Sequence, residues 1–158
     1  MVTKNILHEL FEYKNGVLYS KIDRYKTSIK KNDVIGTINT QGYLRTCINK
    51  KHYKVHRLIF MMHYGYMPKE IDHIDCNKLN NKIENLREAT HSQNLCNKTK
   101  LKNNTSGIKG VCLHHGKWRV RVGLNNKTIS IGVFDNLELA ELVAAEARSK
   151  FHGNFAKN

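Results

Sequence analysis

Asp72 and His73 are neighbours in this chain, and two amide side chains, Asn85 and Asn94, follow them. A carboxylate and a carboxamide are hard oxygen ligands that suit Mg²⁺ or Mn²⁺. The imidazole of His73, with an ordinary pKa of about 6.5, can accept a proton from water near neutral pH. Asp72 and Asn94 around one cation, with His73 beside a phosphodiester, would therefore form a centre for nucleic-acid cleavage. The expected products are a 5′ phosphate and a 3′ hydroxyl, and one such centre would nick one strand at a time.

The surrounding sequence predicts elements that would bring these side chains together. Ile71 and Ile74 bracket the Asp-His pair in a short extended segment, and residues 75–82 are too rich in Asn and charge to be anything but a loop. Residues 85–90 can return as a second short strand. Thr90 then suits the N-cap of a helix, which places Asn94 in its first turns. The order strand, loop, strand, helix would bring His73 and Asn94 together.

Several of these residues also have simpler interpretations. An isolated Asp-His pair in a strand is usually a surface or capping pair, and it is the complete series that argues for a site. Asn77, Asn80 and Asn81 fit turn formers better than ligands, because Asn tolerates the left-handed conformation. For the pair of His56 and Arg57, contact with a phosphate near the cut and a structural role at the junction of hairpin and helix are both open.

The charge of the chain agrees with a polyanionic substrate. The 158 residues include 27 Lys and Arg against 13 Asp and Glu, a formal net charge of +14. Residues 1–57 and 99–158 carry this excess, whereas residues 58–98 contain five basic and five acidic side chains. A protein that grips DNA on both sides of a reactive centre would have this distribution. A basic ribosomal or nucleoid protein would match the total equally well.

Composition also excludes some classes of protein. No apolar run approaches the roughly 18 to 20 residues needed to span a bilayer, and the N-terminus lacks a signal pattern. We therefore expect a cytoplasmic protein without membrane contact. The four cysteines form no C-x-x-C pair, so we expect reduced, packed thiols in place of a disulfide framework. No heptad pattern is present, which makes a monomer the default.

The N-terminal part predicts a helix, short strands and a hairpin ahead of the Asp-His pair. Apolar residues at helical spacing precede the turn signal Asn15-Gly16, and residues 43–56 read as a hairpin folded about Asn49-Lys50-Lys51. The apolar run that follows predicts a buried helix that ends at Gly65.

The C-terminal part has a different pattern. Residues 108–113, 117–124 and 128–134 predict three strands, and a helix capped by Asn136 follows them. In the second strand Trp118, Val120 and Val122 should face inward, which leaves the basic side chains between them on the exposed face. Residues 99–106 between the two parts are polar and basic, as in a linker.

Taken together, the first part resembles the HNH endonucleases of phages and mobile introns. The matching residues are Val55-His56-Arg57-Leu58, then Ile71-Asp72-His73-Ile74-Asp75-x-Asn77-x-x-x-Asn81-x-x-x-Asn85-Leu86-x-x-x-Thr90-His91-Ser92-x-Asn94. The resemblance implies a ββα-metal fold (HNH, His-Me finger) with His73 as general base and Asp72 and Asn94 as metal ligands. It also implies that Asn85 braces the loop. Thr90 and Gln93 stand where zinc-containing members carry cysteines, so no structural zinc is expected.

The last part resembles the DNA-binding domain of plant Apetala-two transcription factors. The match lies in Ser106-Gly107-Ile108-Lys109-Gly110-Val111, Gly116-Lys117-Trp118-Arg119-Val120, Ile131-Gly132-Val133-Phe134-Asp135 and Phe151-His152-Gly153-Asn154-Phe155-Ala156. It implies a sheet that lies in the major groove of double-stranded DNA. The residues expected to face DNA are Lys109, His114, Lys117, Arg119, Arg121, Thr128 and Ser130. An ordinary solvated strand face is the simpler alternative.

The predicted architecture is α+β: an HNH nuclease domain over residues 1–98, with its ββα-metal core at about 70–98, a linker over 99–106, and three antiparallel strands packed on one helix over 107–158. The predicted function is a metal-dependent, homing-type DNA endonuclease using one Mg²⁺ or Mn²⁺. A catalytically silent DNA-binding protein on the same scaffold is the main alternative. An RNA-binding protein is less well supported, because Trp118 looks committed to the core and leaves no aromatic residue for stacking.

Overall fold

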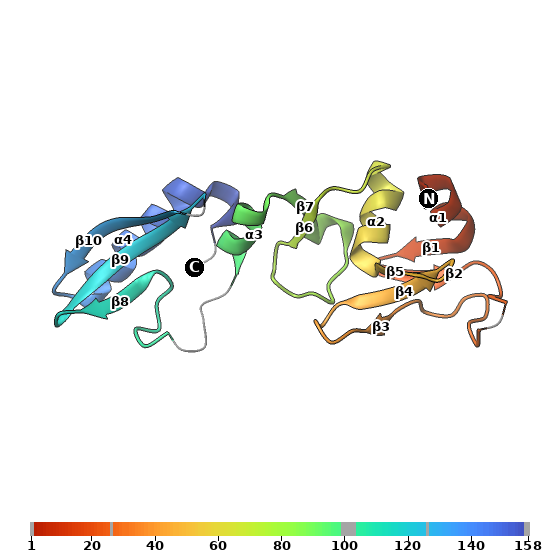
Figure 1. Ribbon diagram of the computed structural model, residues 1–158, viewed down its shortest axis with the longest axis horizontal. Helices are drawn as coiled ribbons and strands as arrows, with labels where there is room; N and C mark the ends of the chain where they lie inside the picture. The colour runs from red at the N-terminus through yellow and green to blue at the C-terminus, as the bar shows by residue number, and fades with distance from the viewer. Residues whose placement is uncertain (1, 26, 99–103, 126, 157–158) are drawn as a thin grey trace. The chain divides into compact units, whose positions relative to one another are not determined.

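The computed structural model describes residues 2–25, 27–98, 104–125 and 127–156, and these form a mixed α and β structure with several small sheets (Figure 1). By its internal contacts the chain divides into two compact units. We call Met1–Glu88 unit 1 and Ala89–Asn158 unit 2. The predicted linker falls largely on residues 99–103, which lie outside the described residues.

Unit 1 begins with a helix and a hairpin, as the sequence predicts. Helix α1 (Lys4–Leu10) is capped by Thr3, whose side chain accepts a hydrogen bond from the Ile6 amide. Strands β1 (Phe11–Lys14) and β2 (Val17–Ser20) pair in antiparallel fashion. Asn15 and Gly16 join them with positive φ angles of 47° and 88°, the conformation that a two-residue hairpin turn requires.

A second sheet leads into the central helix of unit 1. It contains β3 (Thr37–Ile38), β4 (Leu44–Ile48) and β5 (Lys51–Lys54), and helix α2 (Val55–Tyr64) follows without a loop. The prediction of strand at Val55 and His56 was therefore wrong, because both lie in the first turn of α2. The helix ends where expected, at Gly65 in the left-handed conformation.

The core of unit 1 lies between the helices and these sheets. Helix α1 packs against α2, and α2 packs against β4 and β5. Most of the buried apolar side chains come from α1, β1, β2, β4 and α2. The full set is Leu7, Phe11, Leu18, Ile35, Ile48, Val55, Leu58, Ile59, Phe60, Met62, Ile71 and Leu86. The core thus fixes α2 and the segment that carries Asp72.

The Asp-His pair lies in a two-stranded sheet formed by β6 (Glu70–His73) and β7 (Leu86–Ala89). Between them runs the Asn-rich loop, which ends in a 3-10 turn, η1 (Ile83–Asn85). Helix α3 (His91–Asn97) follows β7 and belongs to unit 2.

The rest of unit 2 is a three-stranded antiparallel sheet covered on one face by a helix. The strands are β8 (Val111–His114), β9 (Lys117–Leu124) and β10 (Lys127–Phe134), in the order β10-β9-β8. The first is shorter than predicted. Helix α4 (Leu137–His152), followed by the 3-10 turn η2 (Gly153–Phe155), packs against the sheet. Its N-cap is Asn136, as predicted, and the core joins Val111, Val120, Ala140 and Ala144.

Two expectations about composition can be compared with this structure. None of the helices in the described part of the chain is long and apolar enough to cross a membrane. All four cysteines are free thiols, but none is buried and Cys47 is exposed, so the prediction of packed thiols was wrong.

Candidate functional site

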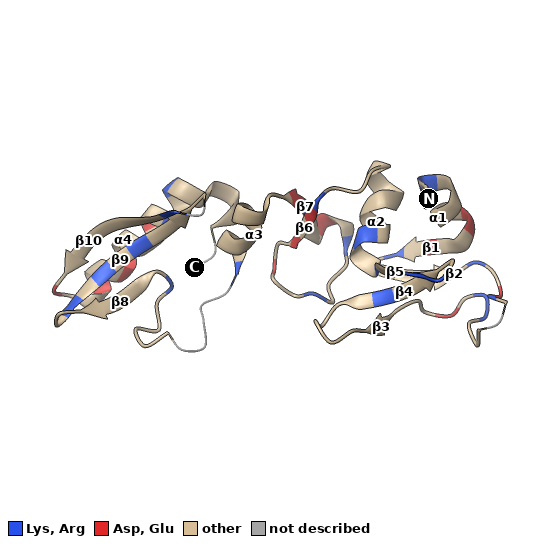
Figure 2. Cartoon of the chain, in the orientation of Figure 1, with Lys and Arg blue, Asp and Glu red and all other residues tan. Residues whose placement is uncertain are grey.

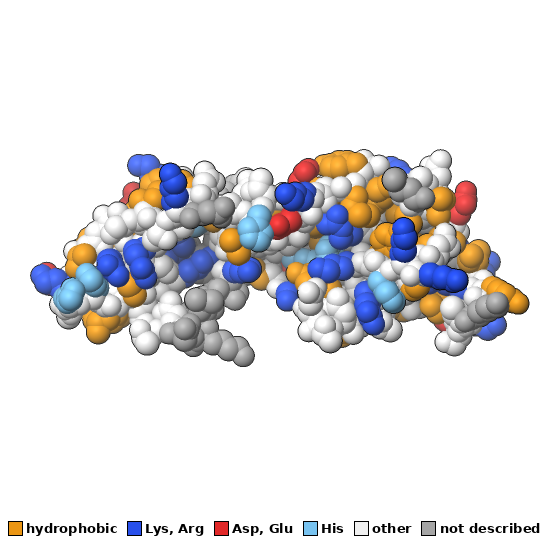
Figure 3. Space-filling view, viewed as in Figure 1, with side chains coloured by type: hydrophobic (Ala, Val, Ile, Leu, Met, Phe, Trp, Pro, Cys, Tyr) orange, Lys and Arg blue, Asp and Glu red, His pale blue; other side chains and the backbone are white. Residues whose placement is uncertain are grey.

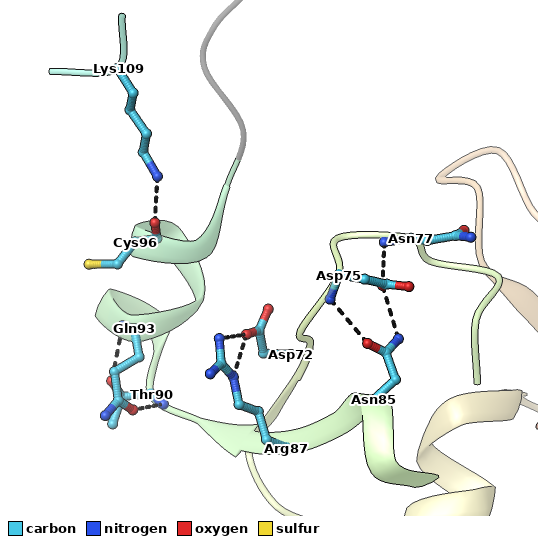
Figure 4. Close-up of polar contacts among 9 residues, drawn as sticks. All are labelled: Asp72, Asp75, Asn77, Asn85, Arg87, Thr90, Gln93, Cys96 and Lys109. Atoms are coloured by element: carbon cyan, nitrogen blue, oxygen red, sulfur yellow. Dashed lines mark hydrogen bonds and ion pairs between the residues drawn. The ribbon is translucent and has the colours of Figure 1, made fainter. Parts of the chain in front are cut away.

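Asp72 is a buried carboxylate held by an arginine. Its side chain is on β6, with the residue only 4% exposed, and Arg87 approaches it from the neighbouring strand β7. Arg87 Nε and Nη2 lie 2.9 and 2.8 Å from the same oxygen, Asp72 Oδ2 (Figure 4). This contact fixes the orientation of the carboxylate. It also places a positive charge beside the carboxylate.

His73 is buried next to it, and its ring is oriented by Asn81. His73 Nε2 lies 3.1 Å from Asn81 Oδ1, and both residues are at most 5% exposed. An amide oxygen only accepts hydrogen bonds, so His73 donates from Nε2 and its lone pair is on Nδ1. Burial is the main cause that lowers the pKa of His73; the hydrogen bond to Asn81 opposes it. The imidazole is thereby kept in the neutral form that a general base needs.

A second histidine packs against the first. The rings of His56 and His73 meet edge to face with centroids 4.8 Å apart, and the Tyr43 ring lies 5.1 Å from His56. Burial, and then the charge of His73, lowers the pKa of His56 to about 3. A neutral ring that is 4% exposed fits the structural role at the hairpin–helix junction better than contact with a phosphate.

Arg57, the other residue considered for phosphate contact, is also engaged within unit 1. It donates hydrogen bonds from Nη2 to the Pro68 carbonyl at 2.7 Å and from Nη1 to the Lys69 carbonyl at 3.3 Å. These bonds hold the segment that enters β6 against α2. The contact with a phosphate stays a prediction.

Asn85 makes the hydrogen bonds that a brace of the loop would make. Its Oδ1 accepts from the Asp75 amide at 3.0 Å, and its Nδ2 donates to Asp75 Oδ1 and to the Asn80 carbonyl at 2.9 and 2.8 Å (Figure 4). Asn77 is a turn former, as predicted, because its Oδ1 accepts from the Leu79 amide. One side chain thus ties the start of the Asn-rich loop to its end.

Asn94 lies in α3, in unit 2, where its amide donates to the Thr90 carbonyl. The helix begins with a capping box: Thr90 Oγ1 accepts from the Gln93 amide, and Gln93 Oε1 accepts from the Thr90 amide (Figure 4). The predicted N-cap at Thr90 is therefore confirmed.

The donor chemistry of the site fits a hard divalent cation. Among the described residues no group of three or more His, Cys, Asp or Glu side chains could hold a metal. Carboxylate oxygens such as those of Asp72, and amide oxygens such as that of Asn94, are ligands of the kind that Mg²⁺ and Mn²⁺ prefer.

In unit 2 six of the seven predicted DNA-facing residues share the sheet face opposite α4. Cross-strand pairs join His114 with Lys117 and Ser130 with Arg121, while the paired Val111 and Val120 face the helix. Figure 2 shows basic residues repeated along β9, and Figure 3 shows Lys, Arg and His side chains together there.

The members of this face differ in their surroundings. Lys117 pairs with Asp135 at 2.8 Å, and Arg119 Nη1 lies 3.5 Å from His114 Nε2. Thr128 pairs with Gly123 across the sheet and is exposed. Lys109 precedes β8, off the strand, and donates to the Cys96 carbonyl at 2.6 Å.

Comparison with known proteins identifies the region that contains Asp72 and His73. A family model described as HNH endonuclease matches residues 53–96, which include Asp72, His73, Asn85 and Asn94. Protein 3.8 of Escherichia phage T7 is 38% identical over 99 residues, which cover 59% of this chain and 79% of that protein. The chain belongs to the HNH endonuclease family. No solved structure matches the chain.

Two residues of this HNH region gain roles that the sequence did not indicate. Asn81 was predicted as a turn former, but its buried side chain contacts His73, and Arg87 was not singled out. Nothing local distinguishes Asn81 from Asn77 and Asn80 in an Asn-rich loop. Both residues lie inside the matched range, and both contact the Asp-His pair from another element: Asn81 from the loop and Arg87 from β7.

Proposed function

We propose that this protein is a metal-dependent HNH DNA endonuclease, of the homing type, that nicks DNA and leaves 5′-phosphate and 3′-hydroxyl ends. The observation that carries the proposal is the buried pair at the end of β6: an imidazole oriented by Asn81 beside a carboxylate oriented by Arg87. Family membership supports a DNA substrate. The enzyme acts as a monomer in the cytosol of a phage-infected or bacterial cell.

In this proposal each residue has one task. His73 accepts a proton from the attacking water at Nδ1, because Nε2 is bonded to Asn81. Asn85 holds the loop that carries Asn81 close to β6. Asp72 and Asn94 are the residues that would hold one Mg²⁺ or Mn²⁺, as the resemblance to HNH endonucleases implies. That cation, when bound, supplies Lewis-acid stabilisation of the negative charge that develops at the phosphate and on the leaving oxygen.

The sheet of unit 2 provides DNA binding in the same proposal. Six of the predicted residues lie on one sheet face: His114, Lys117, Arg119, Arg121, Thr128 and Ser130. A strand face of this kind fits the major groove of a duplex. The resemblance to the Apetala-two domain rests on the sequence motifs, and the cationic face supports it.

The test of the enzyme is cleavage of supercoiled plasmid in Mg²⁺. The wild-type chain should convert it to the nicked circle, and His73→Ala should abolish this conversion while DNA binding persists. Asn77→Ala is a matched control, because it alters another polar loop residue that lies outside the proposed centre. Nicking that persists in His73→Ala, or a wild-type chain that never nicks any DNA tested, would contradict the proposal that the protein is an endonuclease with this active site.

The affinity for duplex DNA, measured at rising salt concentration, tests whether the exposed sheet face binds DNA. Arg121→Ala should weaken the affinity for duplex DNA and reduce the salt dependence by about one unit of slope, because one phosphate contact is lost. The rate of cleavage at saturating DNA should stay unchanged. A slower rate at saturation with unaltered affinity would contradict the assignment of this face.

A second candidate function is a catalytically silent DNA-binding protein on the HNH scaffold. The Asp72–Arg87 ion pair is the observation that favours it, because a guanidinium neutralises the carboxylate that the cation would need. The plasmid assay separates the two. A silent protein binds the plasmid without nicking it at any Mg²⁺ or Mn²⁺ concentration.

A further inference from the structure

Two lysines from distant parts of unit 1 meet on one tyrosine ring. Lys54 Nζ lies 4.2 Å and Lys78 Nζ 4.9 Å from the centroid of the Tyr43 ring. Lys54 ends β5, Lys78 belongs to the Asn-rich loop, and Tyr43 directly precedes β4. The Lys78 ammonium also donates to the Gln41 carbonyl at 2.9 Å, which fixes its position.

No carboxylate lies in ion-pair contact with this pair of like charges among the described residues, although the charges of Asp72 and Glu70 reach Tyr43 from further away. Within the described residues neither Lys54 nor Lys78 forms an ion pair with Asp or Glu. Burial, then the charges of Arg57 and Lys78, lowers the pKa of Lys54. Lys54 is also the N-cap of α2, whose first turn contains no acidic residue, so the positive end of the helix dipole adds to the same field. An anion placed here would relieve the repulsion.

The lysine pair lies next to the proposed general base. The ring of Tyr43 that it shares is 6.0 Å from the ring of His73 and 5.1 Å from that of His56. Figure 2 shows basic residues at the start of α2 and in the loop between β6 and β7. An anion held by both ammonium groups would therefore lie in the same cluster of side chains as the imidazole.

We infer that Lys54 and Lys78 together bind one backbone phosphate of the DNA strand that is cut, adjacent to the scissile linkage, with the Tyr43 ring holding the two ammonium groups in place. This inference rests on the proposed function, because it takes DNA as the substrate. Lysine binds phosphate as a point charge and reads no base, so this contact positions the strand without adding sequence preference.

The test measures how salt affects binding of a 30-base-pair duplex of arbitrary sequence, in EDTA so that no cleavage occurs. The double variant Lys54→Met, Lys78→Met should show a slope of log affinity against log salt that is shallower by about 0.9, the value for one lost phosphate. Lys54→Arg, Lys78→Arg should keep the wild-type slope. Lys14→Met is the control: it removes one positive charge from unit 1 at a lysine that is already paired with Glu12 at 3.0 Å.

An unchanged slope in the double Met variant, equal to that of Lys14→Met, would overturn the inference. The inference and the proposed function fail in different ways. A wild-type chain that binds no duplex at any salt concentration overturns both. A wild-type chain that binds and nicks DNA, with the double Met variant showing the wild-type slope, overturns only the phosphate contact.

Discussion

The hydrogen bond between His73 and Asn81 decides which ring nitrogen of the general base carries the lone pair. The bond is buried, so water cannot replace Asn81 as acceptor without a rearrangement of the loop. The Asn81 Nδ2 atom is itself buried and without a partner among the described residues. A buried amide group left unsatisfied costs free energy, which suggests that the residue is kept for its oxygen. Asn81 is in this account a positioning residue.

Asn81→Ala should lower the cleavage rate at saturating DNA by about tenfold or more, by analogy with the residues that orient metal-ligating histidines. Asn81→Asp keeps an acceptor and should recover part of the rate. The distinguishing readout is the ¹⁵N spectrum of the His73 ring, which reports the tautomer. A variant Asn81→Ala that melts at a lower temperature but keeps the Nε2–H tautomer and the full rate would show a merely structural role.

His56 should make unit 1 sensitive to acid. In the unfolded chain His56 binds a proton below its ordinary pKa of about 6.5, whereas the folded protein binds it only near pH 3. Between these values the unfolded state holds more protons, so the free energy of unfolding falls as the pH falls from about 6.5 towards 3. The loss attributable to His56 is on the order of 1.4 kcal/mol per pH unit within this window.

Urea unfolding at pH 7, 6 and 5 measures this effect. His56→Gln should flatten the dependence on pH, whatever its effect on stability at pH 7. His52→Gln, which changes an exposed histidine of the same unit, should leave the dependence as in wild type. Equal pH dependence in all three proteins would contradict the burial of a neutral His56.

At the scale of elements, the capping box sets the start of α3 and hence the position of Asn94 in its first turns. Thr90→Ala should cost about 0.5 to 2 kcal/mol of local stability, because the Gln93 amide loses its acceptor. Thr90→Ser retains the hydroxyl and should cost little. Hydrogen exchange at the Gln93 amide is the measurement, and equal protection in wild type and Thr90→Ala would contradict the role of the cap.

Elements with strong end signals could be predicted from the sequence, and the others could not. Gly65, Thr90 and Asn136 each mark a helix end by local chemistry, and each does so in the structure. The start of α2 was missed because the side chain of its N-cap residue, Lys54, makes no capping hydrogen bond. Without a capping signal, the strand pattern of the hairpin continues through Val55 in the sequence. Asn81 could not be predicted because its role depends on a partner in another element, not on its neighbours in sequence.

At the scale of the whole molecule, the positive charge is divided between two compact units that carry different chemistry. Unit 1 contains the Asp-His pair and the lysines on Tyr43, and unit 2 contains the cationic sheet face. In this account the chain binds DNA through separate phosphate contacts in each unit. The net charge of +14 then comes from basic side chains at several phosphate contacts. In this account it raises the rate at which the protein associates with DNA as well as the affinity.

The central claim is that Asp72 and His73, side by side at the end of β6, act as one centre for DNA cleavage. Plasmid nicking rates of Asp72→Ala, His73→Ala and the double variant in Mg²⁺ test it most directly, because residues that act as one unit have non-additive effects. Each single variant should lose about a hundredfold or more in rate, and the double variant should be no slower than the worse single one. An Asp72→Ala variant that nicks like wild type, or losses that multiply in the double variant, would contradict the claim.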